Sequence, residues 1–196
     1  MERFRFGTKE IIGTVLSVII IAVLRYAELA LTLSGTIDPR VSEWIIPAIP
    51  VVTLAAVFFG PVAGLISGIG GNLVKCAIFS TYIDYPEIIT LGVYGLVVGL
   101  YFGKMHFDHG RFTGTTFLDF NAVHIMTGIF CGMFLLPMLR FFMEDANLYD
   151  SVITGAKYCA GDTAFIAIFC SLIIMAVSFV TKRRTAATAL EDEELL

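Results

Sequence analysis

Six stretches of this sequence are predominantly apolar, and they limit what the chain can fold into. They cover residues 11–33, 45–59, 61–80, 87–105, 121–141 and 153–181. A helix needs about 20 apolar residues to cross the hydrocarbon core of a bilayer. The six stretches therefore predict six membrane-spanning helices. The second stretch is short, and Pro47 and Pro50 within it predict a kink or a late helix start.

Composition supports a membrane protein and excludes several other classes. Of the 196 residues, 57% are hydrophobic and 15% are charged, whereas soluble domains average about 45–50% apolar and about 25% charged residues. Disordered chains, collagen-like chains and nucleic-acid modules do not tolerate so much apolar surface. Six helices also leave little length for a soluble domain. The predicted fold is an all-α membrane protein, a bundle of six transmembrane helices.

The distribution of lysine and arginine predicts the orientation of this bundle. Arg25 and Lys75 lie within predicted spans, and the remaining basic residues flank them. With the N-terminus in the cytosol, eight basic residues lie inside: Arg3, Arg5, Lys9, Lys104, Arg111, Lys182, Arg183 and Arg184. Only three then lie outside: Arg40, Arg140 and Lys157. Because basic residues favour the cytosolic side, both termini are predicted to be cytosolic.

Three segments follow from this topology. Residues 1–10 are expected to be a cytosolic N-terminus, residues 11–184 a single six-helix membrane domain, and residues 185–196 a disordered acidic cytosolic tail.

The sequence shows no motif for catalysis. The glycine-rich run from Gly64 to Lys75 lacks the Gly-Lys-Ser/Thr ending that cradles phosphates, so ATP hydrolysis by that route, catalytic residues and a cofactor are not expected. His106, Asp108 and His109 lie in a predicted cytosolic loop. They are weak candidates for a metal site, and a solvated loop without metal is expected.

Polar side chains inside the apolar stretches fall mainly on the predicted outer side. A charge in hydrocarbon costs at least about 2.5–3.5 kcal/mol on insertion scales, so it must be paired or face a wet cavity. The candidate binding residues are Arg25, Glu28, Asn72, Lys75, Tyr94, Lys157 and Asp162. Trp44, at the outer start of the second span, is either an interfacial anchor or a stacking lid over a ligand.

Two interpretations of this outer cluster remain open. In the first, internal ion pairs such as Arg25–Glu28 and Lys75–Asp162 connect the helices. In the second, the same residues line a pocket open to the outside. Four cations (Arg25, Lys75, Arg140, Lys157) then exceed two central anions (Glu28, Asp162). This excess favours a small solute with an anionic or strongly polar group.

Glycines recur every four residues in three of the predicted spans. The positions are Gly60, Gly64 and Gly68, then Gly95, Gly99 and Gly103, then Gly128 and Gly132. Small residues at this spacing let helices approach closely, which predicts tight packing within the bundle. Alternatively, they form a smooth surface that slides against another protein. Gly13 and Ser17 in the first span are the best candidates for such a surface.

These patterns together resemble the S component of energy-coupling factor (ECF) transporters. The resemblance rests on six short spans with cytosolic termini, on the turn FGPVAG at 59–64 and its glycine-rich continuation to Asn72, and on GVYGLVVG at 92–99. It covers about residues 8–184. The turn is moderately specific, and the rest is a general pattern.

The resemblance implies a function and partners. In that family the S component captures a vitamin or related micronutrient at the outer face of a prokaryotic plasma membrane. It then associates with a transmembrane T component and two cytosolic ATPases. The family's first helix typically carries Ala-xxx-Ala where it meets the T component. Here that stretch is Gly13-xxx-Ser17, so the residue size matches but the residues differ. Gly60 and Gly64 are further candidate contacts.

Three other functions are considered. A rhomboid-type protease needs Gly-x-Ser-Gly and a histidine at the same depth, but Ser67-Gly68 follows Leu65-Ile66 and His124 is expected near the cytosolic face. A stand-alone secondary transporter or channel would be favoured by inverted repeats, and no convincing repeat is visible. A purely structural membrane subunit is the third. Nothing in the sequence indicates nucleic-acid binding.

Overall fold

The structure, a computed structural model, describes residues 7–38, 46–79, 82–102 and 114–180, and all regular elements in these ranges are helical. They are α1 (Thr8–Leu33), α3 (Ala48–Phe59), α4 (Pro61–Phe79), α5 (Tyr85–Phe102), α6 (Gly114–Ile129), η3 (Phe130–Leu135), α7 (Leu136–Glu144), α8 (Leu148–Phe165) and η4 (Ile166–Cys170). The segments α6, η3 and α7 form one continuous helix, and the helix of α8 and η4 continues to Val180. The predicted all-α fold of six helices is confirmed.

Five of the six helices are long and apolar enough to cross a membrane, and α3 is the exception. Its 12 residues extend about 18 Å at 1.5 Å per residue, less than the roughly 30 Å of a hydrocarbon core. The predicted late start of this helix is confirmed. Pro47 is its N-cap and Pro50 lies in its first turn, where a missing N–H leaves no helical hydrogen bond unmade.

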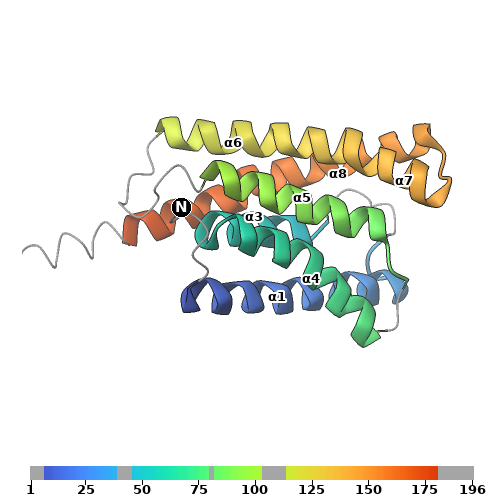
Figure 1. Cartoon of the computed structure of the whole chain (residues 1–196), viewed down its shortest axis with the longest axis horizontal. Helices are drawn as coiled ribbons and strands as arrows, with labels where there is room; N and C mark the ends of the chain where they lie inside the picture. Colours follow the sequence, from blue (N-terminus) through green and yellow to red (C-terminus); the bar gives the residue numbers. More distant parts are fainter. Residues whose placement is uncertain (1–6, 39–45, 80–81, 103–113, 181–196) are drawn as a thin grey trace, which may run out of the picture.

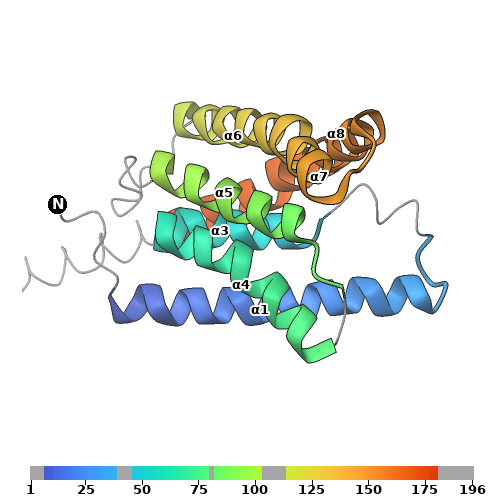
Figure 2. The ribbon, with the colours of Figure 1, turned by 45° about the vertical axis from the view of Figure 1, so that its right-hand side comes forward.

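The short helix α3 lies inside the bundle (Figures 1 and 2). Helix α3 packs against α1, α4 and α5. At its C-terminal end, a tight turn at Gly60 connects it to α4. Gly60 has φ +90°, a conformation that side chains rarely adopt. Pro61 then starts α4 at the first helical position, which its fixed φ suits. The predicted turn between the second and third spans is therefore present.

The helices form two groups that share α5 (Figure 2). On one side of α5 lie α4, α3 and α1, and on the other lie α6, η3 and α7, which pack with α8. The outer surfaces of these groups are apolar. Long runs of exposed side chains on α1 and on the Leu148–Val180 helix are Ile, Leu, Val, Met and Phe. Such a surface would be costly in water and is expected against lipid. The chain is a multi-pass membrane protein.

Glycines set the closest helix contacts. A methyl group added at Gly64 would lie 2.5 Å from the carbonyl oxygen of Gly95 on α5, and one at Gly68 would lie 2.5 Å from the carbonyl oxygen of Leu91. Gly132 and Gly155 meet in the same way between η3 and α8. The first of the two interpretations of the glycine pattern, tight packing within the bundle, is confirmed at these positions.

A π-helical segment interrupts the long helix between α6 and α7. It spans Phe130–Leu135 and ends two residues before Pro137. Proline has no N–H for the carbonyl four residues earlier, and its ring crowds that carbonyl. A π-helical turn before Pro137 is wider than an α-helical turn and relieves this crowding. Pro137 therefore explains the distortion. Cys131 and Gly132, which lie in the widened segment, also line the pocket described below.

The Gly64 contact gives a stability prediction. Replacing Gly64→Ala places a methyl group against rigid backbone of α5, so we expect the free energy of unfolding to fall by about 2 kcal/mol. The matched control is Gly128→Ala, whose added methyl group would meet its nearest atom at an ordinary 3.6 Å. Thermal unfolding of both variants in detergent measures the difference. Equal melting temperatures for the two variants would contradict the close contact.

Candidate functional site

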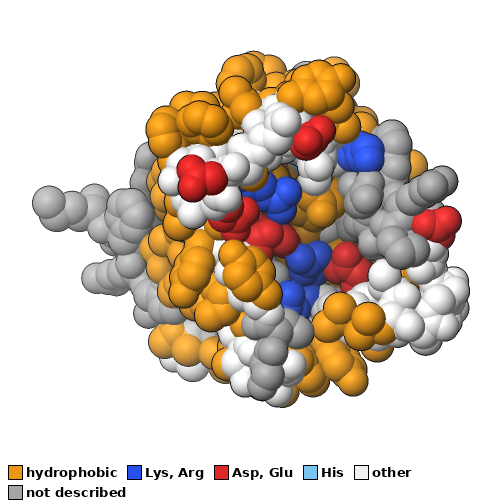
Figure 3. Space-filling view, turned by 90° about the vertical axis from the view of Figure 1, so that its right-hand side faces the viewer, with side chains coloured by type: hydrophobic (Ala, Val, Ile, Leu, Met, Phe, Trp, Pro, Cys, Tyr) orange, Lys and Arg blue, Asp and Glu red, His pale blue; other side chains and the backbone are white. Residues whose placement is uncertain are grey.

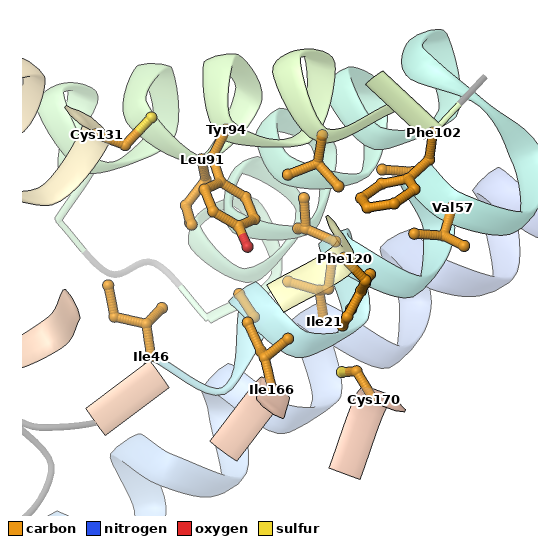
Figure 4. Close-up of a cluster of buried hydrophobic side chains, with 14 of the residues drawn as sticks. Ile21, Ile46, Val57, Leu91, Tyr94, Phe102, Phe120, Cys131, Ile166 and Cys170 are labelled. Carbon is orange, nitrogen blue, oxygen red and sulfur yellow. The ribbon is translucent and has the colours of Figure 1, made fainter. Parts of the chain in front are cut away.

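The centre of the bundle is a cluster of buried side chains from several helices. In Figure 4, Tyr94 and Leu91 extend from α5 into the space that Ile46 and Ile166 approach from the opposite side. Tyr94 is 2% exposed and places a hydroxyl group among hydrocarbon. A buried hydroxyl without a partner would be costly. The Tyr94 hydroxyl therefore needs hydrogen-bond partners, and neighbouring polar side chains supply them.

Tyr94 lies in the middle of a chain of hydrogen bonds that links three helices. Thr53 on α3 donates its hydroxyl to the backbone carbonyl of Ile49 over 2.9 Å. The Thr53 and Tyr94 hydroxyl oxygens lie 3.1 Å apart. On its other side the Tyr94 hydroxyl is hydrogen-bonded to Nδ1 of His124 on α6. The ring of His124 is also stacked on Phe120.

A pocket lies beside this chain of hydrogen bonds. Its wall combines the start of α3, the first half of α5, α6 with η3, and α8. Most of the wall is apolar, and six of its polar or aromatic residues are Glu87, Thr90, Tyr94, His124, Tyr158 and Asp162. Concave sites with apolar walls and a few fixed polar groups are typical of small-molecule binding sites.

Asp162 is the most isolated acid of this pocket. It comes from α8, and it is 2% exposed. One carboxylate oxygen accepts a hydrogen bond from the backbone N–H of Ile46 over 3.1 Å. The other oxygen, Oδ2, has no hydrogen-bond partner among the described residues, and neither has Nε2 of His124. Two polar atoms in the pocket wall thus lack partners within the described part of the protein.

Arg25 holds a compact charged cluster next to the pocket. Its guanidinium contacts Glu28 on the same helix at 2.7 Å and Glu87 on α5 at 2.6 Å. Its Nε also donates to Oδ1 of Asn72 on α4 over 3.3 Å. Three helices therefore meet at one cation. Because Glu87 also lines the pocket, it joins the cluster to the cavity.

The charged cluster lies toward one end of the bundle, where α1 and α4 end and α5 begins (Figure 1). Figure 3 shows that acidic and basic side chains gather in the middle of this end face. Arg140 on α7 contacts Asp84 at 3.0 Å there. Tyr82 donates a hydrogen bond to Glu144 over 3.2 Å, which raises the pKa of the Tyr82 hydroxyl because ionisation would remove the bond. These contacts tie the segment before α5 to α7.

Several of the predicted binding residues meet in space. Arg25, Glu28 and Asn72 share one cluster, and Tyr94 and Asp162 line the pocket. Of the two predicted ion pairs, Arg25–Glu28 is confirmed. The Lys75–Asp162 pair is wrong, because Asp162 accepts from the backbone of Ile46 instead.

Other predicted binding residues lie elsewhere. Lys75 and Lys157 are half-buried, and neither is among the residues of the pocket wall. Trp44 lies outside the described residues, as do His106, Asp108 and His109.

The residues predicted to contact a partner have internal neighbours. Gly13 is buried against the ring of Phe59, and Ser17 is buried and donates its hydroxyl to the Gly13 carbonyl over 2.8 Å. Gly64 packs against Gly95, while Gly60 has open space around its α-carbon. A contact of these positions with a partner stays a prediction.

Sequence reasoning missed the role of His124. The helix was expected to start near residue 121, which placed His124 near the cytosolic face. In the structure α6 starts at Gly114, so His124 lies ten residues along it, about 15 Å at 1.5 Å per residue. The expected helix start near residue 121 was wrong, because Gly114–Phe120 contains polar residues that lower the hydropathy of the first turns. Glu87, which lines the pocket and pairs with Arg25, was not among the predicted binding residues.

Comparison with known proteins finds relatives of this chain in bacteria. The chain is 31% identical over 100 residues to a UPF0397 protein of Staphylococcus aureus (strain bovine RF122 / ET3-1), a match that covers 49% of this chain and 53% of that protein. A UPF0397 protein of Lactobacillus gasseri is 25% identical over 126 residues, with 64% and 65% covered. A UPF0397 protein of Streptococcus pneumoniae (strain Hungary19A-6) is 30% identical over 88 residues, with 45% and 48% covered.

The chain is distantly homologous to UPF0397 proteins. Its match spans about half the length of the first of these relatives. No family model matches the chain, and no solved structure matches it.

The Arg25 cluster gives a second stability prediction. Replacing Arg25→Leu leaves Glu28 and Glu87 close together without their cation, so we expect the free energy of unfolding to fall by about 2 kcal/mol. Adding Glu87→Gln to this variant removes one of the two uncompensated charges and should restore part of the loss. Melting temperatures in detergent measure both effects. A double variant as unstable as the sum of the two single variants would show that the residues act independently.

Proposed function

We propose that this chain is the substrate-capture subunit of an ECF-type importer, which binds a vitamin or related small polar micronutrient. The observation that carries the proposal is the pocket between α3, α5, α6 and α8, with polar atoms of His124 and Asp162 in an otherwise largely apolar wall. An apolar wall supplies affinity, and a few fixed polar groups supply orientation.

The arrangement suits capture better than a structural role. A purely structural bundle gains nothing from a buried acid with an oxygen that has no partner, because such a group lowers stability. Among the described residues, Oδ2 of Asp162 is such an atom. A ligand that binds there offsets this cost in the loaded state. In this proposal the same oxygen lowers the stability of the empty protein and contributes to its affinity for the ligand.

Partners supply the energy in this proposal. The chain itself is proposed not to be an enzyme, and ATP hydrolysis is assigned to two cytosolic ATPases that act with a transmembrane T component. Two features support this assignment: the resemblance at 59–64 and 92–99, and the tight Gly60–Pro61 turn between α3 and α4.

The proposal also places the pocket toward the outside of the cell. The Arg25 cluster and Glu87 lie toward the end of the bundle that the basic residues predict to be outer. The protein would then lie in a prokaryotic plasma membrane with both termini in the cytosol. A stand-alone secondary transporter or channel is the alternative, and the transport experiment below separates the two.

Ligand retention tests the pocket. We expect mass spectrometry of small molecules released from the gently purified protein to detect a bound metabolite. Gly128→Leu should abolish the signal, because Gly128 lines the pocket and has room for a side chain. The control is Ala122→Leu, on the exposed side of the same helix, which should retain the metabolite. Equal retention by both variants would place the bound molecule elsewhere.

Transport tests the need for partners. Proteoliposomes that contain this chain alone should bind the metabolite identified above without accumulating it. Adding a T component and two ATPases from the same organism, with ATP, should produce accumulation. Uptake by the chain alone under a proton or sodium gradient would contradict the proposal and support a secondary transporter.

A further inference from the structure

The hydrogen-bond chain through Tyr94 occupies Nδ1 of His124. The hydroxyl groups of Thr53 and Tyr94 can each donate or accept, so this chain is compatible with either tautomer of His124. The charge of a pocket occupant is therefore set by the acids of the wall, and Asp162 is the acid whose oxygen has no partner among the described residues.

Asp162 presents the pocket with a buried oxygen. Oδ2 of Asp162 has no hydrogen-bond partner among the described residues, and the side chain is 2% exposed. Thr90 adds no donor, because its hydroxyl is donated to the backbone carbonyl of Pro86 over 2.7 Å. The oxygen of an ionised acid accepts hydrogen bonds, so it favours a donor in whatever fills the cavity.

The charges of the pocket wall also favour a ligand that donates hydrogen bonds. The described residues of the wall include two acids, Glu87 and Asp162, and no lysine or arginine. Arg25, the nearest cation of the cluster, is paired with Glu28 and Glu87. The sequence-based expectation of an excess of positive charge does not fit this wall. A negatively charged group would face Asp162 without a compensating cation in the wall.

We propose that the pocket takes a small organic cation or a donor-rich neutral molecule, such as an amine or amidine on an apolar or aromatic frame. Its N–H groups bind Oδ2 of Asp162, and its frame lies against Leu91 and the ring of Tyr158. A ligand cation also stabilises the ionised form of the buried carboxylate. This assignment rests on the proposed capture function and names its substrate class.

Three probes of matched size and shape test the assignment: benzamidine (cationic, donor), benzamide (neutral) and benzoate (anionic). Binding to the full chain in nanodiscs is measured by ligand-observed NMR titration. We expect benzamidine to bind about tenfold or more tighter than benzoate, because a charge-assisted pair of N–H donors matches the carboxylate. Benzoate binding equal to or tighter than benzamidine binding overturns the assignment.

A substitution at Asp162 tests the atom itself. In Asp162→Asn the amide oxygen can keep the bond from Ile46, and the amide NH₂ then replaces the accepting oxygen in the pocket. We expect the preference for benzamidine over benzoate to fall about tenfold or more. The control Asp119→Asn, an exposed acid on α6, should leave the preference unchanged. An unchanged preference in Asp162→Asn contradicts the assignment, and the wild-type comparison decides the case if that variant does not fold.

The outcome separates the substrate class from the capture function. A metabolite that copurifies and is anionic overturns the substrate class and leaves the capture function standing. If no probe binds and no metabolite copurifies, both are overturned. Benzamidine binding that Gly128→Leu abolishes and Ala122→Leu retains supports both at the same pocket.

Discussion

A polar group at membrane depth must find its hydrogen-bond partner inside the protein, because hydrocarbon offers none. Most of the buried polar side chains in this bundle obey that constraint and thereby fix its geometry. Arg25 draws together α1, α4 and α5 by contacting Glu28, Asn72 and Glu87. Tyr94 connects α3, α5 and α6 through Thr53 and His124. These bonds hold the helices that form the pocket wall.

Glycine contacts and the pocket occupy different sides of α5. Toward α4, Gly64 and Gly95 bring the two backbones into direct contact, so that side is filled and rigid. Toward α6 and α8, the side chains of Leu91 and Tyr94 line the pocket. Gly132, which also lines the pocket, meets Gly155 of α8 in close contact. A cavity results where close packing ends, because interhelical distance follows the size of the residues at each contact.

Counting charges along the sequence and locating them in space lead to opposite electrostatic conclusions. Four cations against two central anions indicated a positive pocket. In space, Glu87 joins the cluster and pairs with Arg25, while Lys75 and Lys157 are not among the wall residues. Among the described residues, Oδ2 of Asp162 keeps no partner. The electrostatic potential in the pocket depends on which charges are paired and on which side chains face the cavity. A net count of charges along the sequence gives neither piece of information.

The sequence alone determined the helical fold, the approximate spans, the tight turn at Gly60–Pro61 and the close packing at the glycines. Each of these follows from hydropathy or from local backbone chemistry, which the order of residues contains. It also placed Arg25 and Glu28 within reach of each other, because residues three apart share a helix face. The tertiary structure decided the rest. The position of His124 along α6 depended on the polar first turns of that helix, and the Ile46–Asp162 bond joins residues 116 positions apart. Such contacts depend on how helices rotate and approach one another, and no local pattern in the sequence specifies that.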